Sequence, residues 1–192
     1  MNQKNNDDLE LYESIKKIAQ QDRDAFASFY YQISPRIARF LSRFLKKDDL
    51  IEETISDVML VVWQNAGKYE PTAKVTSWVF GIAYNKALKT LERERRSSNS
   101  SRNVSFEEED HDIAIEDREK PESLVMNSAL NSEIYRAMDI LSDQHRAVIE
   151  LTFFEGFSYP EIAEIVGCPT NTVKTRVFHA KQKLAKYLAK LQ

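Results

Sequence analysis

The chain has 192 residues, 42% of them hydrophobic, with only 4 glycines and 5 prolines. This composition is typical of one or two domains built from long helices, and it argues against a protein of short strands and tight turns. The formal net charge is −3, and the single cysteine, Cys168, excludes an intramolecular disulfide, which fits a reducing compartment.

The sequence does not predict a segment that targets or spans a membrane. The first residues, MNQKNNDDLELYES, are polar and acidic, unlike a signal peptide. No apolar run approaches the roughly 18 residues that a membrane span needs. We therefore expect a cytoplasmic protein with no membrane insertion.

Hydrophobic residues spaced three and four apart predict helices throughout the first half. A weak pattern covers residues 7–19, a well-marked one covers 24–45, and another covers 48–65. Pro35 is expected to bend or interrupt the second of these helices. After a loop that contains Pro71, Thr76 or Ser77 is expected to cap a helix that runs to about residue 96.

The pattern stops at residue 97, where Ser, Asn and acidic residues dominate. Residues 97–122 carry nine acidic and three basic residues, a local charge of −6. Such a segment cannot offset its ordering entropy by burial, so residues 97–121 are predicted to be a flexible acidic linker. The flanking stretches 68–96 and 161–192 each carry +4, and local charge is what a polyanion senses.

Helical periodicity returns at residue 122 and continues to 141, and Ser142 is expected to cap the next helix. Ser158 and Glu161 then form a capping-box pattern, Gly167 ends that helix, and Thr170 is expected to cap the last one. No segment alternates like a strand. The predicted fold is all-α, with two small helical domains, 1–96 and 122–192, and a helix-turn-helix in the second.

The last helix has two contrasting faces. An apolar stripe of Val173, Val177, Ala180 and Leu184 is predicted to pack inward. Polar and basic residues lie opposite or on the flanks, where small side chains can approach base edges and cations can reach phosphates. A packed helical hairpin with a solvated basic face is the alternative interpretation.

Motifs in both halves resemble bacterial RNA polymerase sigma factors, above all the compact extracytoplasmic-function (ECF) class. The first half resembles the family's second region at Glu52, Glu53, Ser56, Asp57, Met59 and Trp63, and after the loop at Ser77, Trp78, Val79, Ile82, Ala83 and Asn85, with Arg93, Arg95 and Arg96 closing the helix. The stretch LSDQHRAVIELTFFEGFSYPEIAEIVGCPTNTVKTRVFHAKQKL resembles its fourth region. Ser56-Asp57 replaces the usual Gln-Glu and Ser77 replaces Thr, whereas Gly81 and Tyr84 stand where the family often has basic residues.

The resemblance implies a non-enzymatic protein, without a cofactor, that binds core RNA polymerase, directs it to two-element promoters and assists melting. The polymerase would be contacted at the clamp coiled coil of its largest subunit and at the flap of its second-largest subunit, and an anti-sigma factor is a further expected partner. Docking is assigned to Glu52, Glu53, Ser56 and Asp57, although a solvated acidic face is the simpler interpretation of these residues alone. The acidic linker is expected either to run toward the RNA exit path or only to keep the chain solvated.

Two sets of residues are the expected DNA contacts. The proximal promoter element and its melting are assigned to Lys68, Tyr69, Lys74, Trp78, Tyr84, Asn85, Lys86, Lys89 and Arg93, because an unpaired base needs hydrogen-bonding or stacking groups with cations nearby. Trp63 and Trp78 lie near the apolar stripe and are expected mainly in the core. The upstream element is assigned to Thr170, Asn171, Thr172, Lys174, Thr175, Arg176, Phe178 and His179.

Two other function classes compete with this interpretation. An operator-binding regulator would need a sensing domain in the first half. The alternating strands of a receiver domain are missing, whereas a small helical ligand-sensing domain stays an alternative, although such a domain usually comes with a dimerisation helix. An α-helical enzyme would need a ligand constellation, and His111, His145 and Cys168 have no metal-ligand spacing. Run-off transcription with core polymerase distinguishes these classes.

Overall fold

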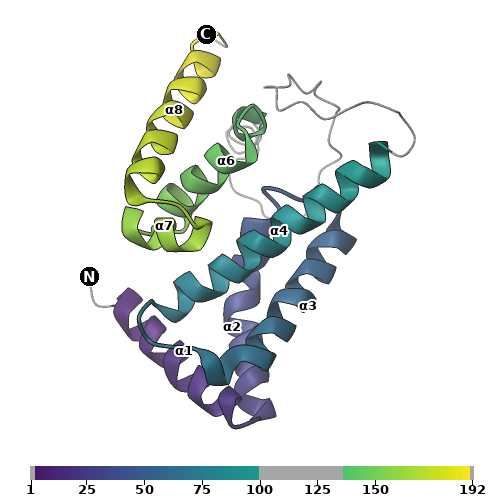
Figure 1. Cartoon of the computed structure of the whole chain (residues 1–192), viewed down its shortest axis with the longest axis vertical. Coiled ribbons are helices and arrows are strands. Elements are labelled where there is room, and N and C mark those ends of the chain that lie inside the picture. Colours follow the sequence, from purple (N-terminus) through teal and green to yellow (C-terminus); the bar gives the residue numbers. More distant parts are fainter. Residues whose placement is uncertain (1–2, 100–135, 191–192) are drawn as a thin grey trace.

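The computed structural model describes residues 3–99 and 136–190, where every regular element is a helix (Figure 1). The first half forms α1 (Gln3–Ala19), α2 (Arg23–Leu41), α3 (Asp48–Asn65), the short 3₁₀ turn η1 (Ala66–Lys68) and α4 (Val75–Asn99). The second half forms α6 (Asp143–Ile149), the π-helical turn η2 (Glu150–Phe154), α7 (Tyr159–Val166) and α8 (Thr170–Leu188). The all-α prediction is confirmed. Residues 97–99, expected to begin the linker, still belong to α4. The rest of the expected linker and the start of the helix expected at 122 lie outside the described residues.

The first half is a bundle around the apolar faces that the sequence predicts. Helix α2 buries Phe29, Ile33 and Ile37 at successive turns, and α3 buries Val58 and Val62 against it. This spacing puts one side chain per turn on the same face, so each helix buries a continuous stripe. The bounds predicted for α3 are those observed.

Pro35 does not interrupt α2, which continues to Leu41. A proline in a helix removes the hydrogen bond to the carbonyl four residues earlier, here that of Tyr31. Both Pro35 and Tyr31 are exposed, so water can serve that carbonyl and the helix tolerates the loss. Residues 42–44 form a turn instead of the predicted last helical turn.

Helix α4 is capped from a distant segment. The helix begins at Val75, so Thr76 and Ser77 lie inside it and do not cap it. Instead, the backbone N–H and the hydroxyl of Thr76 both donate to Asp8 Oδ1 of α1, each at 3.2 Å. A carboxylate here accepts from an otherwise unpaired donor and interacts favourably with the positive end of the helix dipole.

Of the other helix caps that the sequence predicts, those at Ser142 and Ser158 form and the one at Thr170 does not. Ser142 accepts from the N–H of His145, and Ser158 and Glu161 form a capping box, as the sequence predicts. Thr170 is the first residue of α8 and does not cap it, because Pro169 occupies the cap position. Proline has no N–H to satisfy and fixes an extended backbone suited to a helix start.

The two halves pack against each other into one hydrophobic cluster. Helices α4 and α7 lie side by side (Figure 1), and the Phe80 and Phe157 rings meet edge to face with centroids 5.1 Å apart. Beside them, Arg43 Nε lies 3.1 Å from Glu150 Oε2, with both side chains almost fully buried. Burial raises the pKa of the Glu150 carboxyl, and the charge of Arg43 opposes that shift.

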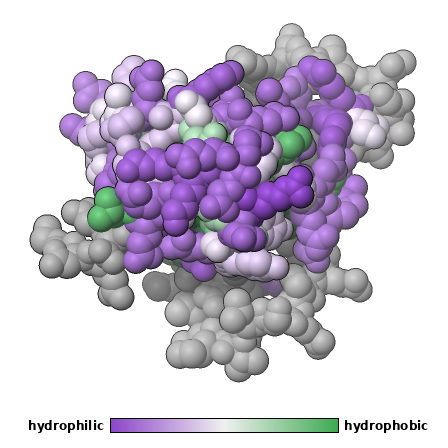
Figure 2. Space-filling view, turned by 90° about the horizontal axis from the view of Figure 1, so that it is seen from below, coloured by the Kyte–Doolittle hydropathy of each residue, from purple (hydrophilic) through white to green (hydrophobic). Residues whose placement is uncertain are grey.

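One face of the molecule is largely polar. The face in Figure 2, seen from below relative to Figure 1, is mostly hydrophilic, with only isolated hydrophobic residues. None of the helices in the described ranges is both long enough and apolar enough to span a membrane.

The turn between α7 and α8 depends on the backbone freedom of Gly167. Its φ is +66°, and a Cβ added there would meet no atom within 4 Å. We therefore expect Gly167→Ala to lower the free energy of unfolding by about 1–2 kcal/mol through backbone strain alone. Denaturant unfolding of the full chain measures this. Gly167→Asn should lose less, since Asn tolerates the left-handed region, and an Ala variant as stable as wild type would contradict this account.

Candidate nucleic-acid and polymerase interfaces

Helix α8 presents the predicted upstream-element residues on the face opposite its buried stripe. Val173, Val177 and Ala180 are buried as predicted. The exposed set comprises Asn171, Lys174, Thr175, Phe178 and His179, while Thr170, Thr172 and Arg176 are half-buried. The helix therefore offers small polar groups and a cation to solvent near its N-terminal end, where a base-reading helix contacts DNA.

Two of these side chains are already engaged within the chain. The Thr175 hydroxyl donates to the carbonyl of Asn171 at 3.0 Å, and an Arg176 Nη1–H donates to the Cys168 sulfur at 3.6 Å. Phe178 is 57% exposed and lies edge-on against His179. An exposed aromatic beside a polar face is the type of group that contacts a thymine methyl or a base plane.

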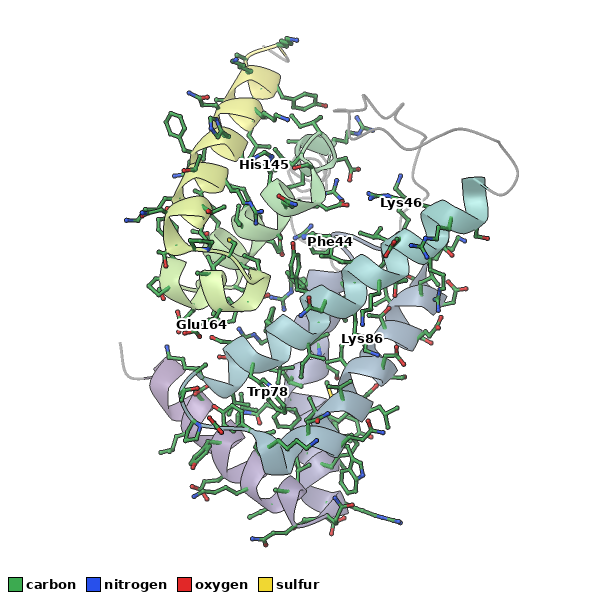
Figure 3. All side chains as sticks on the ribbon, in the orientation of Figure 1. Phe44, Lys46, Trp78, Lys86, His145 and Glu164 are labelled. Atoms are coloured by element: carbon green, nitrogen blue, oxygen red, sulfur yellow. The ribbon has the colours of Figure 1, made fainter. Side chains whose placement is uncertain are left out.

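The loop before α4 is held by an aromatic stack that begins in α1. The Tyr69 ring lies 5.1 Å from that of Trp78 and 6.2 Å from that of Tyr12, measured between centroids. The Tyr69 hydroxyl donates to the carbonyl of Ala73, and burial, followed by the negative charge of Asp8, raises the pKa of Tyr69 to about 12. Trp78 is half-buried and is labelled in Figure 3 near the start of α4. Both rings therefore shape the loop.

The cations of α4 lie next to the acids of α3. Lys86 Nζ is 2.9 Å from Asp57 Oδ2, and Arg93 makes a two-pronged contact of 3.1 Å each with the carboxylate of Glu53. Figure 3 labels Lys86 on α4, on the side where α3 runs alongside. Asn85 and Lys89 are exposed. The structure thus pairs two predicted docking residues with two predicted DNA-contacting residues.

The same helix α3 borders an apolar hollow of about 590 Å³ between α2 and α3. Its walls are Arg23, Phe26, Tyr30, Ser56, Met59, Leu60 and Trp63. Leu60 is 52% exposed, and Trp63 packs edge-on against Phe26. Ser56 lies within this hollow, and Glu52 and Glu53 are exposed on the same helix, so α3 offers acidic groups beside an apolar depression.

Lys74 and Tyr84 face the second half of the chain. Lys74 Nζ lies 2.8 Å from Glu161 Oε1. Burial works to raise the pKa of Glu161, but the hydrogen bonds from Lys74 and Ser158 outweigh it, and the pKa lies below its usual range. Tyr84 is 4% exposed, and burial raises its pKa against the opposing charge of Arg176. Lys68 is exposed on the loop.

Comparison with known families agrees with this division into two regions. Residues 29–97 match sigma-70 region 2, and residues 131–184 match sigma-70 region 4. The chain belongs to the ECF-type RNA polymerase sigma factors. Such a factor directs RNA polymerase to promoters and is not itself a catalyst. Its two sigma regions imply binding to the polymerase and to promoter DNA.

Similar proteins cover most of this sigma factor. It is 28% identical over 184 residues to the ECF RNA polymerase sigma factor SigK of Mycolicibacterium vanbaalenii, covering 93% of this chain and 89% of that protein. The structure of CnrH in complex with the cytosolic domain of CnrY is similar with a TM-score of 0.67 and 19% identity, over 94% of this chain and 97% of that one. Bartonella quintana RpoE in complex with the anti-sigma factor NepR is similar with a TM-score of 0.66 and 24% identity, over 85% of this chain and 96% of that one. At these identities the two structures show a shared fold.

No cluster of His, Cys, Asp or Glu suited to a metal occurs among the residues that the structure describes. His145 is half-buried, with its ring nitrogen 2.9 Å from the Ser142 hydroxyl. Cys168 is half-buried in the turn before α8. Both residues therefore belong to local structure around helix ends.

Sequence reasoning missed the part that α1 plays in this sigma factor. Asp8 holds the start of α4, and Tyr12 packs against Tyr69 of the loop before α4. No pattern in the sequence indicates this cap, because Asp8 precedes Thr76 by 68 residues and capping rules consider only residues next to the helix end.

We expect Asp8→Ala to lower the free energy of unfolding by about 1 kcal/mol, the usual cost of losing a helix cap. Asp8→Asn should lose less, because it retains an acceptor oxygen. Denaturant unfolding of the full chain measures both. Glu13→Ala serves as the control: it removes an exposed carboxylate of α1 that pairs with Lys16 of the same helix, and it should change stability by far less than Asp8→Ala. Equal effects of Asp8→Ala and Glu13→Ala would rule out the cap.

Proposed function

We propose that this sigma factor docks on the clamp coiled coil of the largest polymerase subunit through α3. Glu52, Glu53, Ser56 and Asp57 supply acceptors for arginine or lysine side chains of a partner helix. The apolar hollow next to Ser56 supports the proposal, because it offers a place for an apolar side chain of that helix. A merely solvated acidic face would need no such depression.

The pairing of α3 with α4 favours an exchange of partners on docking. Glu53 binds Arg93 and Asp57 binds Lys86, and each of these groups is at least a quarter exposed. Exposed ion pairs contribute little, about 0.2–1 kcal/mol. A polymerase cation can therefore replace Lys86 or Arg93 at small cost, and the released cation becomes available to a DNA phosphate.

For the proximal promoter element, we propose that the exposed members of the predicted set make the direct contacts. These are Lys68, Asn85 and Lys89, together with Lys74, Lys86 and Arg93 once they leave their acidic partners Glu161, Asp57 and Glu53. Tyr69 and Trp78 support the loop through their stacked rings. Asn85 is the one amide in the set and can hydrogen-bond a base edge, whereas the cations follow the backbone.

For the upstream element, we propose that α8 enters the major groove. Thr172, Thr175 and Asn171 would approach base edges, and Thr170 lies at the helix start, where the dipole favours a phosphate. Lys174, Arg176 and His179 would bind phosphates or bases, and Phe178 would contact a thymine methyl. The observation that carries the two-element function is the presence of these two cationic surfaces on the matched sigma regions of one chain.

Two further partners follow from exposed groups and from the relatives. Phe153 and Phe154 are 53% and 42% exposed on η2, and we propose that they bind the flap of the second-largest polymerase subunit. CnrH and RpoE were solved with CnrY and with the anti-sigma factor NepR, and we propose that an anti-sigma factor also binds this chain. The proposed domains are 1–96 and 122–192, joined by the acidic linker 97–121, in a cytoplasmic protein.

The docking proposal predicts opposite changes in two affinities. Replacing Glu53 by Gln and Asp57 by Asn together should weaken binding to core polymerase about tenfold, since two charge-assisted contacts are lost. The same variant should bind nonspecific DNA more tightly in the absence of polymerase, because Lys86 and Arg93 lose their partners. Fluorescence anisotropy with core polymerase and with duplex DNA measures both. Glu13→Gln, on the exposed face of α1, is the control, and unchanged polymerase affinity would exclude the α3 docking face.

Run-off transcription with core polymerase and a library of two-element promoters tests the DNA proposals. Arg176→Ala should reduce upstream-element binding about tenfold, the cost of one specific or phosphate contact.

Asn85→Ala should leave closed-complex binding nearly intact and reduce strand opening, measured by permanganate reactivity. Lys190→Ala, an exposed lysine beyond the end of α8, is the control. Absence of promoter-specific transcripts with an active core would overturn the function, and normal opening by Asn85→Ala would remove that residue.

A further inference from the structure

Helix α1 lies along the loop before α4 from its beginning to its end (Figure 1). Three contacts mark this course: Ala19 beside Gly67, Tyr12 against Tyr69, and Asp8 with Thr76. A Cβ added to Gly67 would lie 3.9 Å from the Ala19 Cβ, which is ordinary van der Waals contact. Residue numbers rise along the loop as they fall along α1, so the loop runs antiparallel to the helix.

The three α1 residues that make these contacts share one face of the helix. Asp8, Tyr12 and Ala19 follow one another at intervals of four and seven residues, which return to the same side of an α-helix. Leu11 and Ile15, between them in the chain, are each 2% exposed and anchor α1 in the bundle. The core therefore fixes which face α1 presents to the loop.

The loop closes on itself through the side chain of Tyr69. The hydroxyl of this residue donates to the carbonyl of Ala73, so the path of the backbone depends on where the Tyr69 ring is held. Tyr12 and Trp78 both pack on that ring, with centroids 6.2 and 5.1 Å away. A residue of α1 thus acts on the loop backbone through the Tyr69 ring.

The tip of the loop carries polar groups that no sequence motif assigned. Glu70, Pro71 and Thr72 are exposed, and the N–H of Thr72 donates to the carbonyl of Glu70 at 2.8 Å. A carboxylate and a hydroxyl can hydrogen-bond the edge of an unpaired base. Such groups bind more tightly when their backbone is already ordered, because less conformational entropy is then lost on binding.

Tyr12 itself is engaged within the chain. Its half-buried ring packs on Tyr69 on the loop side, and Lys16 Nζ lies over it at 4.7 Å. Asp8 is likewise half-buried, and its Oδ1 accepts from both the N–H and the hydroxyl of Thr76. These contacts suit groups that hold the loop, in contrast to the exposed groups at its tip.

We propose that Asp8 and Tyr12 are positioning residues for the proximal promoter element. They hold the two ends of the loop 69–74 in the conformation that receives an unpaired base, and they thereby set base discrimination and strand opening without contacting DNA. When either residue is lost, one end of the loop is released and the loop must be ordered during binding, which weakens capture of the base. This inference rests on the proposed function of the loop, whereas the ordering of the loop by α1 in the free chain does not.

The fluorescence of Trp78 tests that ordering in the free chain. The sequence has two tryptophans, so a Trp63→Phe chain leaves Trp78 as the one reporter. Tyr12→Leu keeps an apolar side chain but removes the ring that packs on Tyr69, whereas Tyr12→Phe keeps the ring. We expect acrylamide quenching of Trp78 to rise about twofold in Tyr12→Leu, through local opening of the loop, and to stay at the wild-type value in Tyr12→Phe.

Tyr31→Leu is the matched control for this measurement. It makes the same change at a tyrosine of α2 that is 77% exposed, and quenching of Trp78 should not change. Circular dichroism checks that each variant is folded. If folded Tyr12→Leu shows the quenching of wild type, α1 does not order the loop and the proposal fails.

The role on the promoter is tested as a ratio of transcripts. Core polymerase with each full-length variant transcribes the most active promoter of the two-element library and derivatives with one base of the proximal element replaced. This ratio does not depend on the folded fraction, so a merely structural loss leaves it unchanged. We expect it to fall about fivefold for Tyr12→Leu and Asp8→Ala, the size of one aromatic pair or one cap, and Tyr12→Phe and Asp8→Asn to restore most of it.

A double-mutant cycle tests the path through Tyr69. If Tyr12 acts through the Tyr69 ring, Tyr12→Leu should lower the ratio little further in a chain that already carries Tyr69→Leu. A second, equally large loss in that background would show that Tyr12 acts elsewhere and would overturn its assignment.

The results separate this inference from the proposed function. Promoter-specific transcripts with an unchanged ratio in folded Tyr12→Leu and Asp8→Ala would refute the positioning role and leave the proposed function standing. Absence of promoter-specific transcripts from the wild-type chain with an active core would refute the proposed function and the promoter role of α1 together. The quenching of Trp78 would then still decide whether α1 orders the loop.

Discussion

Helix α4 has to bury two sides at once, and the rest of this sigma factor is arranged around that constraint. On one side Val79, Ala83 and Ala87 pack into the region 2 bundle. On another, Gly81 lets the backbone of α7 approach. Only small or apolar residues can serve both contacts, so the polar and basic residues are confined to the remaining narrow faces. The helix for which we propose the proximal DNA contacts is therefore also the structural centre of the molecule.

The narrowness of those faces explains why so many cations of α4 are paired within the chain. Lys86 and Arg93 lie against the acids of α3, and Arg95 lies against Asp143 of α6. Intramolecular acids lower the charge that the helix presents to nonspecific DNA, and a partner that engages those acids restores it. The net charge of −3 is therefore compatible with the DNA contacts that we propose for α4, because acids of the same chain pair with these cations.

The sequence predicts the features that depend on residues within one helix, but few of the contacts between segments that are distant in the chain. The period of apolar residues predicted the bounds of α3 and the buried stripe of α8, because both depend on spacing within one helix. The cap of α4 by Asp8 and the pairing of Arg43 with Glu150 were beyond reach, since they depend on which segments fold together. Of the two outcomes expected at Pro35, a bend or an interruption, the interruption was wrong, because the effect of the proline depends on exposure, which a helical period alone does not supply. The polar and basic face of α8 came from its helical period, and the other DNA and docking residues came from the family resemblance; all of them stay predictions.

The buried pair of Arg43 and Glu150 bears on why the two regions meet through charges at all. A permanent interface would gain from apolar residues, since replacing a buried ion pair by packed hydrophobic groups is often neutral or stabilising. Here four ion pairs surround a small aromatic contact, and each places a cation of region 2 against an anion of region 4. Removing one partner of the buried pair would leave an uncompensated charge in the interface, so Arg43 and Glu150 depend on each other even though an apolar pair could be as stable.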